Sequence, residues 1–170
     1  MLRGSVLCAG LAAALGACST PSSPTLESLD QATVLIEHAK GHCESRELFK
    51  SVLDEQGHSV FQGKIVVQPH AQKTDAKMMT RALLLSDDAE ADNKPELEIF
   101  ADDVTCGHGA TTGALDESLL FYLRARGLSE KEAQALLIQA FVGEAIESIA
   151  SDALRDLVVA AAERWLAARG

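Results

Sequence analysis

Hydrophobic residues between about Ala32 and Thr112 come in short bursts that glycine, aspartate, asparagine and proline interrupt. Four of these bursts are ATVLIEH, SVFQGKIVVQP, ALLLSDDAE and PELEIFADDV. Each has the length of a strand and is too short for a helix. Ile65, Leu83 and Ile99 recur at separations of 18 and 16 residues, which predicts the stacked strands of a β-solenoid or a β-sandwich. The segment HCESRELFKSVLD fits an irregular strand or a turn of helix, and the pattern leaves it unassigned.

The alternation of apolar residues changes phase inside the stretch ADDVTCGHGATTG. One face carries Leu97, Ile99 and Ala101, and the other carries Val104, Cys106, His108 and Ala110. A one-residue shift of this kind moves every later side chain to the opposite face of a strand. The pattern therefore predicts a corner or a bulge at Asp102 and Asp103.

The period changes to that of a helix after Ala114. Asp116 can cap a first helix that Gly127 ends, and Ser129 with Glu132 forms a capping-box pattern for a second. A third helix ends near Gly170. The predicted apolar stripes are Leu119, Leu120, Tyr122 and Leu123; Ala133, Leu136, Leu137, Ala140 and Phe141; and Leu154, Leu157, Val158, Ala161 and Trp165. We expect these stripes to pack on each other or on the strands, with a docking surface as the alternative.

Length and net charge limit the number of domains and the kinds of partner that the chain can have. The 170 residues suit one domain, or one domain with an appendage. The net charge of -10 arises almost wholly after Thr25 and would repel a phosphate backbone, so we expect no nucleic-acid partner. Four scattered cysteines make neither a disulfide framework nor a structural zinc site.

The first residues, MLRGSVLCAGLAAALGACSTPSSP, read as a secretion signal with one positive charge at Arg3. Leu15 to Cys18 also resembles a bacterial lipobox, in which the cysteine is lipidated. The apolar stretch is too short to span a bilayer. We treat residues 1–28 as a leader, signal-like or disordered.

Three groups of side chains could carry chemistry. Cys106 and His108 share a strand face and could both ligate a soft or borderline metal, but a zinc or iron centre needs about four donors. The alternative is a buried thiol beside a hydrogen-bonded histidine. The cluster of His38, His42 and Cys43 is interpreted as solvated surface, and adjacent Asp102 and Asp103 as turn residues rather than an acid–base pair. The chain lacks a phosphate loop and a serine nucleophile elbow.

Several of these segments together resemble the SufB/SufD family of the Suf iron–sulfur cluster assembly machinery, in its C-terminal part. The resemblance runs through HCESRELFKSVLD, FQGKIVV, AQKTDA, ALLLSDDAEADNKPELEIFADDVTCGHGAT and LDESLLFYLRARGL. It covers roughly Leu29 to Gly170 and leaves the leader outside. It implies a mainly β fold with an α tail: the end of a right-handed parallel β-helix over residues 29–113, then a helical domain over 114–170.

The resemblance also implies a function: a non-enzymatic scaffold, here a shortened SufD-type chain that works in the cytoplasm. Its β-helix end would pair with a SufB-like subunit, and its C-terminal helices would dock a SufC-like ATPase. His108 would hold or receive a transient iron–sulfur cluster at the seam between the two chains, with Cys106 in a lesser role and no tightly bound cofactor. The missing metal donors would then come from the partner. The alternative is an exported lipoprotein, anchored through Cys18, whose helices bind another protein.

Overall fold

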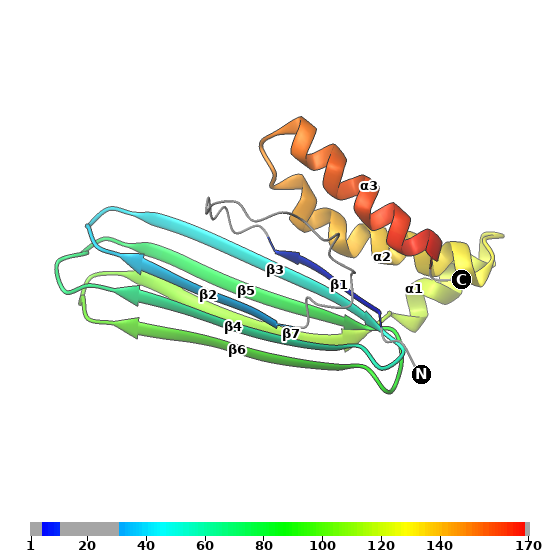
Figure 1. Ribbon diagram of the computed structural model, residues 1–170, viewed down its shortest axis with the longest axis horizontal. Coiled ribbons are helices and arrows are strands. Elements are labelled where there is room, and N and C mark those ends of the chain that lie inside the picture. The colour runs from blue at the N-terminus through cyan, green and yellow to red at the C-terminus, as the bar shows by residue number, and fades with distance from the viewer. Residues whose placement is uncertain (1–4, 11–30, 169–170) are drawn as a thin grey trace, which may run out of the picture.

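Two β-sheets and three helices make up the computed structural model, which describes residues 5–10 and 31–168 (Figure 1). One sheet, here sheet A, has the strand order β1-β3-β5-β7, and the other, sheet B, has the order β2-β4-β6. The strands are β1 (Ser5–Gly10), β2 (Gln31–His38), β3 (Glu44–Asp54), β4 (His58–Val67), β5 (Asp75–Leu84), β6 (Glu90–Ile99) and β7 (Thr105–Ala114). The fold is mainly β with a C-terminal helical region.

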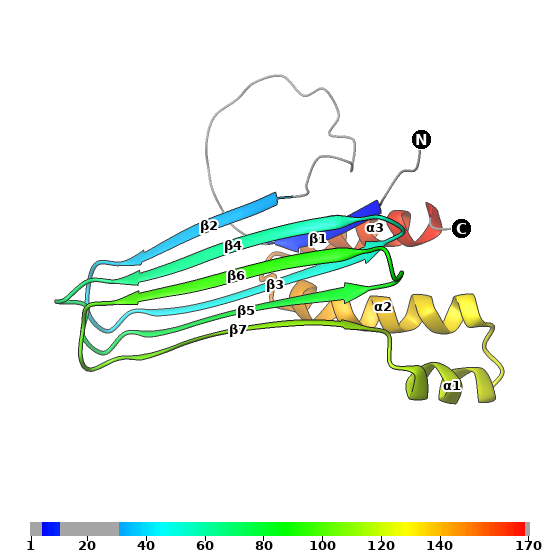
Figure 2. The ribbon, with the colours of Figure 1, turned by 90° about the horizontal axis from the view of Figure 1, so that it is seen from below.

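The chain alternates between the two sheets, so strands that are neighbours in sequence lie in different sheets (Figure 2). From β2 to β7, every pairing within a sheet is parallel. Glu44 is aligned with Asp75, and Asp75 with Thr105, so one coil takes about 30 residues. This is part of a parallel β-helix, as predicted. The recurrence of Ile65, Leu83 and Ile99 at 18 and 16 residues corresponds to half a coil, because these residues lie alternately in sheet B and sheet A.

The space between the sheets is filled by alternate residues of each strand. β4 alternates buried and less buried positions along its whole length, as a strand between a core and solvent does. Its inward residues Phe61 and Ile65 belong to a core with Phe49 and Met78, and the two phenylalanine rings lie 4.4 Å apart. Gly63 faces the same space, where a Cβ atom would come within 2.7 Å of the Phe61 ring and closer still to Met78 Sδ, so a larger residue would force both side chains to move.

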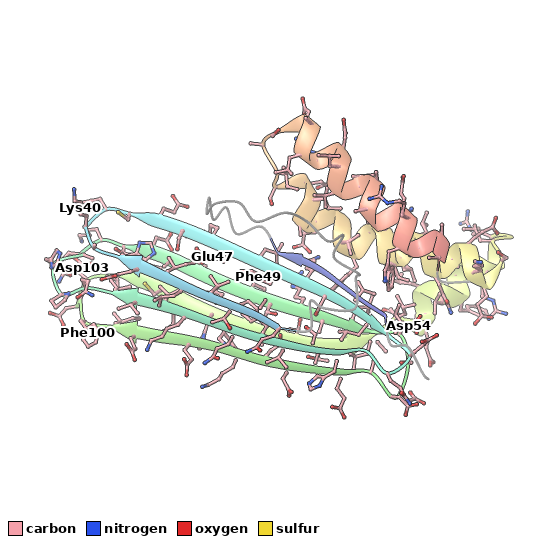
Figure 3. The ribbon with its side chains drawn as sticks, in the orientation of Figure 1. Lys40, Glu47, Phe49, Asp54, Phe100 and Asp103 are labelled. Atoms are coloured by element: carbon pink, nitrogen blue, oxygen red, sulfur yellow. The ribbon has the colours of Figure 1, made fainter. Side chains whose placement is uncertain are left out.

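The unassigned segment HCESRELFKSVLD contains the whole of β3, a strand of 11 residues. Its inward face starts polar and ends apolar, with Glu47 and Phe49 both on this strand (Figure 3). Its outward face is also buried toward its end, because helices cover it. Burial on both faces removes the alternation that identifies most strands, which explains why the pattern gave no assignment.

The predicted helices and their caps are confirmed. They are α1 (Glu117–Ala125), α2 (Glu130–Glu147) and α3 (Asp152–Ala168). Asp116 accepts hydrogen bonds from the N–H groups of Ser118 and Leu119, and Gly127 takes a φ of 98° after α1. Ser129 and Glu132 form both hydrogen bonds of the capping box. The hydrogen bonds from Ser129 also lower the pKa of Glu132.

The predicted apolar stripes are partly wrong. In α2 the buried residues are Ala133, Ile138, Val142 and Ile146, while Leu136 is half exposed. In α3, Trp165 is buried as expected, but Leu157 is 67% exposed. In α1, no residue is buried. Alanine and branched residues lie on nearly every side of α2, so its sequence does not single out one face; contact with the sheet decides which face is buried.

α2 and α3 cover the outward face of sheet A (Figure 1). Val52 of β3 and Leu83 of β5 project from the sheet into a cluster with Ile138, Val142, Ile146, Ile149, Ala162 and Trp165. Within the described ranges, none of the helices is long and apolar enough to cross a membrane.

One part of the expected leader is described. Ser5–Gly10 forms β1, which pairs antiparallel with the end of β3, Phe49 to Asp54. The lipobox pattern ending at Cys18 lies outside the described residues, as do the other residues of 11–30.

Candidate functional site: the free edge of the last strand

The predicted corner at Asp102 and Asp103 is confirmed, since β6 ends at Ile99 and β7 begins in the other sheet at Thr105. Asp103 accepts a hydrogen bond from the Lys73 N–H through its carbonyl oxygen at 2.6 Å, and its own N–H donates to Gln72 Oε1 at 2.8 Å. Its carboxylate forms an ion pair with Lys73. Figure 3 shows Asp103 at the end of the strands where Lys40 and Phe100 also lie. The two aspartates are therefore turn residues, as interpreted from the sequence.

β7 is paired on one edge only. It lies beside β5, and across residues 5–10 and 31–168 no strand pairs with its other edge. Thr105 donates its N–H to Thr74 at 2.8 Å, on the β5 side. Because N–H groups alternate along a strand, those of Cys106, His108, Ala110 and Thr112 point to the free edge. This edge offers a row of backbone donors and acceptors to another strand.

Cys106 and His108 lie on the inward face of this last strand. Cys106 is aligned with Ala76 and His108 with Met78, and both of those β5 residues are fully buried. The thiol of Cys106 is half buried against the same core. His108 is exposed. The pair thus sits at the open end of the β-helix, where a further coil would cover it.

The structure does not complete a metal site around this pair. Among the described residues, no group of three or more His, Cys, Asp or Glu side chains is placed to hold a metal ion.

A hydrogen-bonded link crosses the interior next to the free edge. Thr80 Oγ1 donates to Asn93 Oδ1 at 2.8 Å, and Asn93 Nδ2 donates to Thr112 Oγ1 at 3.3 Å. Asn93 belongs to β6, so this link joins sheet B to two strands of sheet A. It connects the two sheets at the open end of the β-helix.

The second His/Cys cluster is solvated surface only in part, because His42 is exposed while His38 and Cys43 are not. His38 is only 6% exposed, and its Nε2 lies 3.0 Å from Ser45 Oγ. The alternation of Ala32, Val34 and Ile36 in β2 places His38 inside, a signal that the sequence already contained. Cys43 is half buried and donates to the Gly41 carbonyl at 3.8 Å. His38 is therefore an inward-facing residue rather than a surface one.

Glu47 completes a polar group at this end of the interior, and sequence analysis missed it. Burial raises the pKa of Glu47, while the hydrogen bond with Ser45 and the charges of His38 and Arg46 oppose that rise. Among the described residues, its Oε2 atom is buried without a hydrogen-bond partner. The first and last described coils are thus both polar inside, and β2, which carries His38, also pairs on one edge only within the described residues. The β7 end differs because its thiol and its imidazole, Cys106 and His108, lie on one strand.

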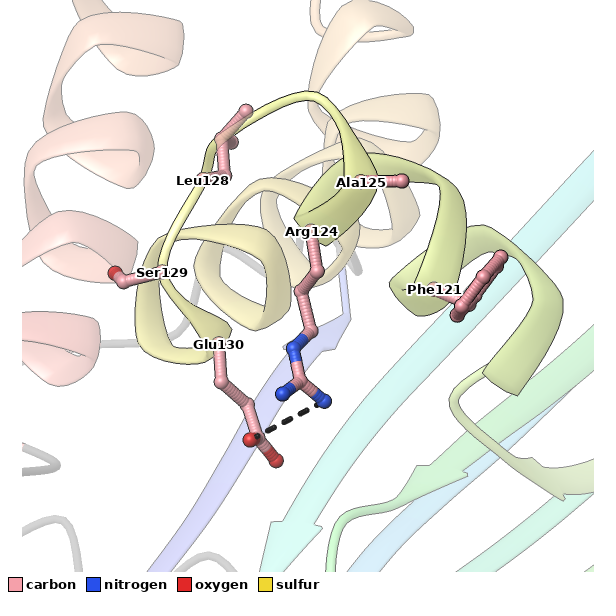
Figure 4. A pocket seen from close by; sticks show the side chains of 6 residues that line it. All are labelled: Phe121, Arg124, Ala125, Leu128, Ser129 and Glu130. Carbon is pink, nitrogen blue, oxygen red and sulfur yellow. Dashed lines mark ion pairs between the residues drawn. The ribbon is translucent and has the colours of Figure 1, made fainter.

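α1 presents an apolar surface away from the sheets. Phe121 is 75% exposed, and Leu119 and Tyr122 are about half exposed. A shallow cavity of about 510 Å³ lies beside them, lined by Phe121, Arg124, Ala125, Leu128, Ser129 and Glu130 (Figure 4). Arg124 and Glu130 pair across it at 3.5 Å. The expectation that the α1 stripe packs against the protein holds only in part, because Leu120 and Leu123 are partly buried while Leu119 and Tyr122 are exposed. An exposed apolar surface of this kind is typical of a docking site.

Comparison with known proteins agrees with this arrangement. Residues 27–141 match the family described as "SUF system FeS cluster assembly, SufBD core domain". The chain belongs to the SufBD core family. It is 46% identical over 125 residues to the iron–sulfur cluster assembly protein SufD of Escherichia coli, covering 74% of this chain and 30% of that protein.

Two further relatives extend the comparison. The SufBD family protein slr0076 of Synechocystis is 44% identical over 117 residues, which are 69% of this chain and 25% of that protein. SufD of Bacillus subtilis is 32% identical over 138 residues, which are 81% of this chain and 32% of that protein. The chain therefore spans about a third or less of the length of these curated relatives.

Proposed function

We propose that the chain is a non-catalytic scaffold in iron–sulfur cluster assembly, whose last strand β7 pairs with a SufB-like subunit. The observation that carries the proposal is the free edge of β7 with Cys106 and His108 beside it. The names of the relatives, which are iron–sulfur cluster assembly proteins, support the process. Membership of the SufBD core family supports a role as a subunit of the SufB/SufD type.

Pairing at β7 follows from the backbone chemistry of an edge strand. A strand of the partner would accept from and donate to the free groups of Thr105–Ala114 and would continue sheet A into a second chain. Such an addition gives affinity through main-chain hydrogen bonds, and it would cover the open end of the interior. His108, which is exposed in this chain, would become an interfacial residue.

The cluster site would then be shared between two chains. Cys106 and His108 supply at most two donors, and an iron–sulfur cluster is held by about four ligands. Residues of the partner strand would supply the others. In this arrangement His108 holds or receives the transient cluster, Cys106 has a lesser role, and the isolated chain binds no cluster tightly.

The helical region would dock a SufC-like ATPase. Phe121 and Tyr122 are exposed aromatic side chains of α1, with the exposed Leu119 next to them, and Phe121 lines the shallow cavity. Aromatic side chains in this setting often carry most of the energy of an interface. Phe121→Ala would weaken ATPase binding, whereas Leu157→Ala, an exposed leucine of α3, would serve as the control.

A proline substitution tests pairing at β7. In Ala110→Pro, the proline removes an N–H group that points to the free edge and leaves the hydrogen bonds to β5 in place. We expect the full chain to keep its fold by circular dichroism but to lose most of its affinity for the SufB-like subunit. Ala110→Val is the matched control, because it keeps the N–H group. Equal binding by both variants would rule out pairing through this edge.

The proposal includes a cytoplasmic location. Fractionation of cells that express the full chain, followed by mass analysis of the N-terminus, tests it against the alternative of an exported lipoprotein. Recovery in the membrane fraction with a lipid on Cys18 would favour that alternative.

A further inference from the structure

A buried lysine joins the helices to the β-helix. Lys50 projects from the outward face of β3, and its side chain is only 1% exposed. Its ammonium group donates to the Phe141 carbonyl of α2 at 2.6 Å and lies 4.4 Å from the centroid of the Phe141 ring. It also donates to the carboxylate of Glu144, one turn further along α2. A buried ammonium group is stable only when a counter-charge and hydrogen bonds replace its water.

Glu144 binds a second cation on the next strand. Arg81 of β5 donates to both carboxylate oxygens of Glu144, at 2.9 and 3.2 Å. Lys50 and Arg81 are aligned partners on β3 and β5, so one helix residue spans two neighbouring strands. The hydrogen bond from Lys50, with the charges of Lys50 and Arg81, holds the pKa of Glu144 below its usual value. We call these three residues the clamp.

The clamp lies next to the apolar contact between helices and sheet, and one strand away from the free edge. Val52 and Leu83 form the adjacent aligned pair on the same outward face. Arg81 is aligned in turn with Thr111 of β7. The same three strands thus carry the clamp on β3 and β5 and the free edge on β7.

We propose that Glu144 is a positioning residue, which fixes the helical region on sheet A so that the surface on α1 and the free edge of β7 keep one relative arrangement. This inference rests on the proposed function, because it gives a reason for holding two partner sites at a fixed separation. Two partners that are joined to each other bind a rigid pair of sites as one ligand, and the second contact then forms at a high effective concentration. If the helices move on the sheet, that advantage is lost while each single contact remains.

Glu144→Gln tests the clamp in the full chain. The substitution keeps the shape of the side chain, removes the charge that Lys50 and Arg81 share, and touches neither partner surface. Glu147→Gln is the matched control, since it removes the same charge from an exposed position of the same helix. Arg81→Gln is a milder second variant, because it leaves the Lys50 contact intact and does not expose a buried charge.

Three measurements carry the test. Hydrogen exchange of the free chain should rise in α2 and around Lys50 in Glu144→Gln, rise less in Arg81→Gln, and stay unchanged in Glu147→Gln. Affinity for the SufB-like subunit alone and for the ATPase alone should stay within about twofold of wild type in all variants. Affinity for the two partners joined as a preformed complex should fall about tenfold or more in Glu144→Gln. Glu144→Asp, which keeps the carboxylate, should restore part of that loss.

The outcomes separate this inference from the proposed function. Unchanged hydrogen exchange in Glu144→Gln would overturn the clamp, and so would unchanged affinity for the preformed complex. Failure of the wild-type chain to bind either partner, with faster exchange in Glu144→Gln, would instead reject the proposed function and support the clamp as the contact that fixes the helices. Loss of each single affinity in Glu144→Gln would show a general structural defect and would also overturn the positioning role.

Discussion

The two faces of sheet A are held by different kinds of contact, although the same strands form both. On the inward face, Phe49 and Met78 belong to an apolar core that passes from coil to coil. On the outward face, Val52 and Leu83 meet the helices beside the ion pairs of Lys50 and Arg81 with Glu144. Another coil can stack on the inward core and extend it. The outward junction holds only the helical region, and its ion pairs fix the orientation of the helices on sheet A.

The inward core should respond most strongly to loss of volume. Ile65 is fully buried, and Ile65→Ala should lower the free energy of unfolding by about 4 kcal/mol, because it leaves a cavity between the sheets. Val66→Ala, on the outward face of the same strand, should cost below about 1 kcal/mol. Urea unfolding followed by circular dichroism measures both. Similar losses for the two variants would mean that the inward core does not dominate the stability of the β-helix.

The apolar part of the outward junction should respond next. Trp165 of α3 is 6% exposed and packs with Val52 and Leu83 in one cluster. Trp165→Ala should cost about 3 kcal/mol, and the loss should release the helices before the strands. Residue-resolved hydrogen exchange would show faster exchange in α2 and α3 with little change in β4. Equal acceleration in β4 would contradict the distinction between the two faces.

The clamp should show an asymmetry that apolar contacts lack. Glu144→Leu leaves the buried ammonium group of Lys50 without its counter-charge. It should cost about 2 kcal/mol, below the usual range for a buried pair because Glu144 is half exposed. Lys50→Met removes the buried charge itself and should change stability by less than about 1 kcal/mol. Thermal unfolding of both variants and of the double variant gives the comparison. A larger loss for Lys50→Met would mean that packing, rather than charge, holds this position.

Glu47 should give the smallest effect, and one that depends on pH. Burial raises its pKa in the folded chain, so the stability it contributes is present below the pKa of the unfolded chain and falls as pH rises through the folded pKa. Glu47→Gln should therefore raise the melting temperature relative to wild type more at pH 7 than at pH 4. The same difference at both values would contradict a raised pKa.

Local rules in the sequence predicted much of the fold. Alternating residues gave most of the strands, the phase change gave the corner at Asp102 and Asp103, and capping residues such as Asp116 and Ser129 gave the helix starts. These features depend on neighbours along the chain. The buried faces of α2 and α3 could not be predicted from the sequence, because contact with sheet A selects them. The clamp could not be predicted either, since only the fold brings Lys50 and Glu144 together.

The candidate site was likewise predictable from the sequence only where its features depend on neighbouring residues. The spacing of Cys106 and His108 was enough to predict that they share a face, and the structure adds that this face lies at the open end of the interior. The spacing of residues in the sequence does not predict the free edge of β7, because pairing between strands about 30 residues apart leaves no local signal. The resemblance to the SufB/SufD family supplied the idea of a seam between two chains.

Cluster formation on the assembled complex shows whether His108 holds the cluster at the seam between two chains. The full chain with His108→Ala would be combined with the SufB-like subunit and the ATPase, and the bound iron and sulfide would be measured after assembly. We expect normal pairing and normal secondary structure with most of the cluster lost, and a smaller loss for Cys106→Ala. Wild-type cluster content in a correctly paired complex that carries His108→Ala would contradict this role of His108.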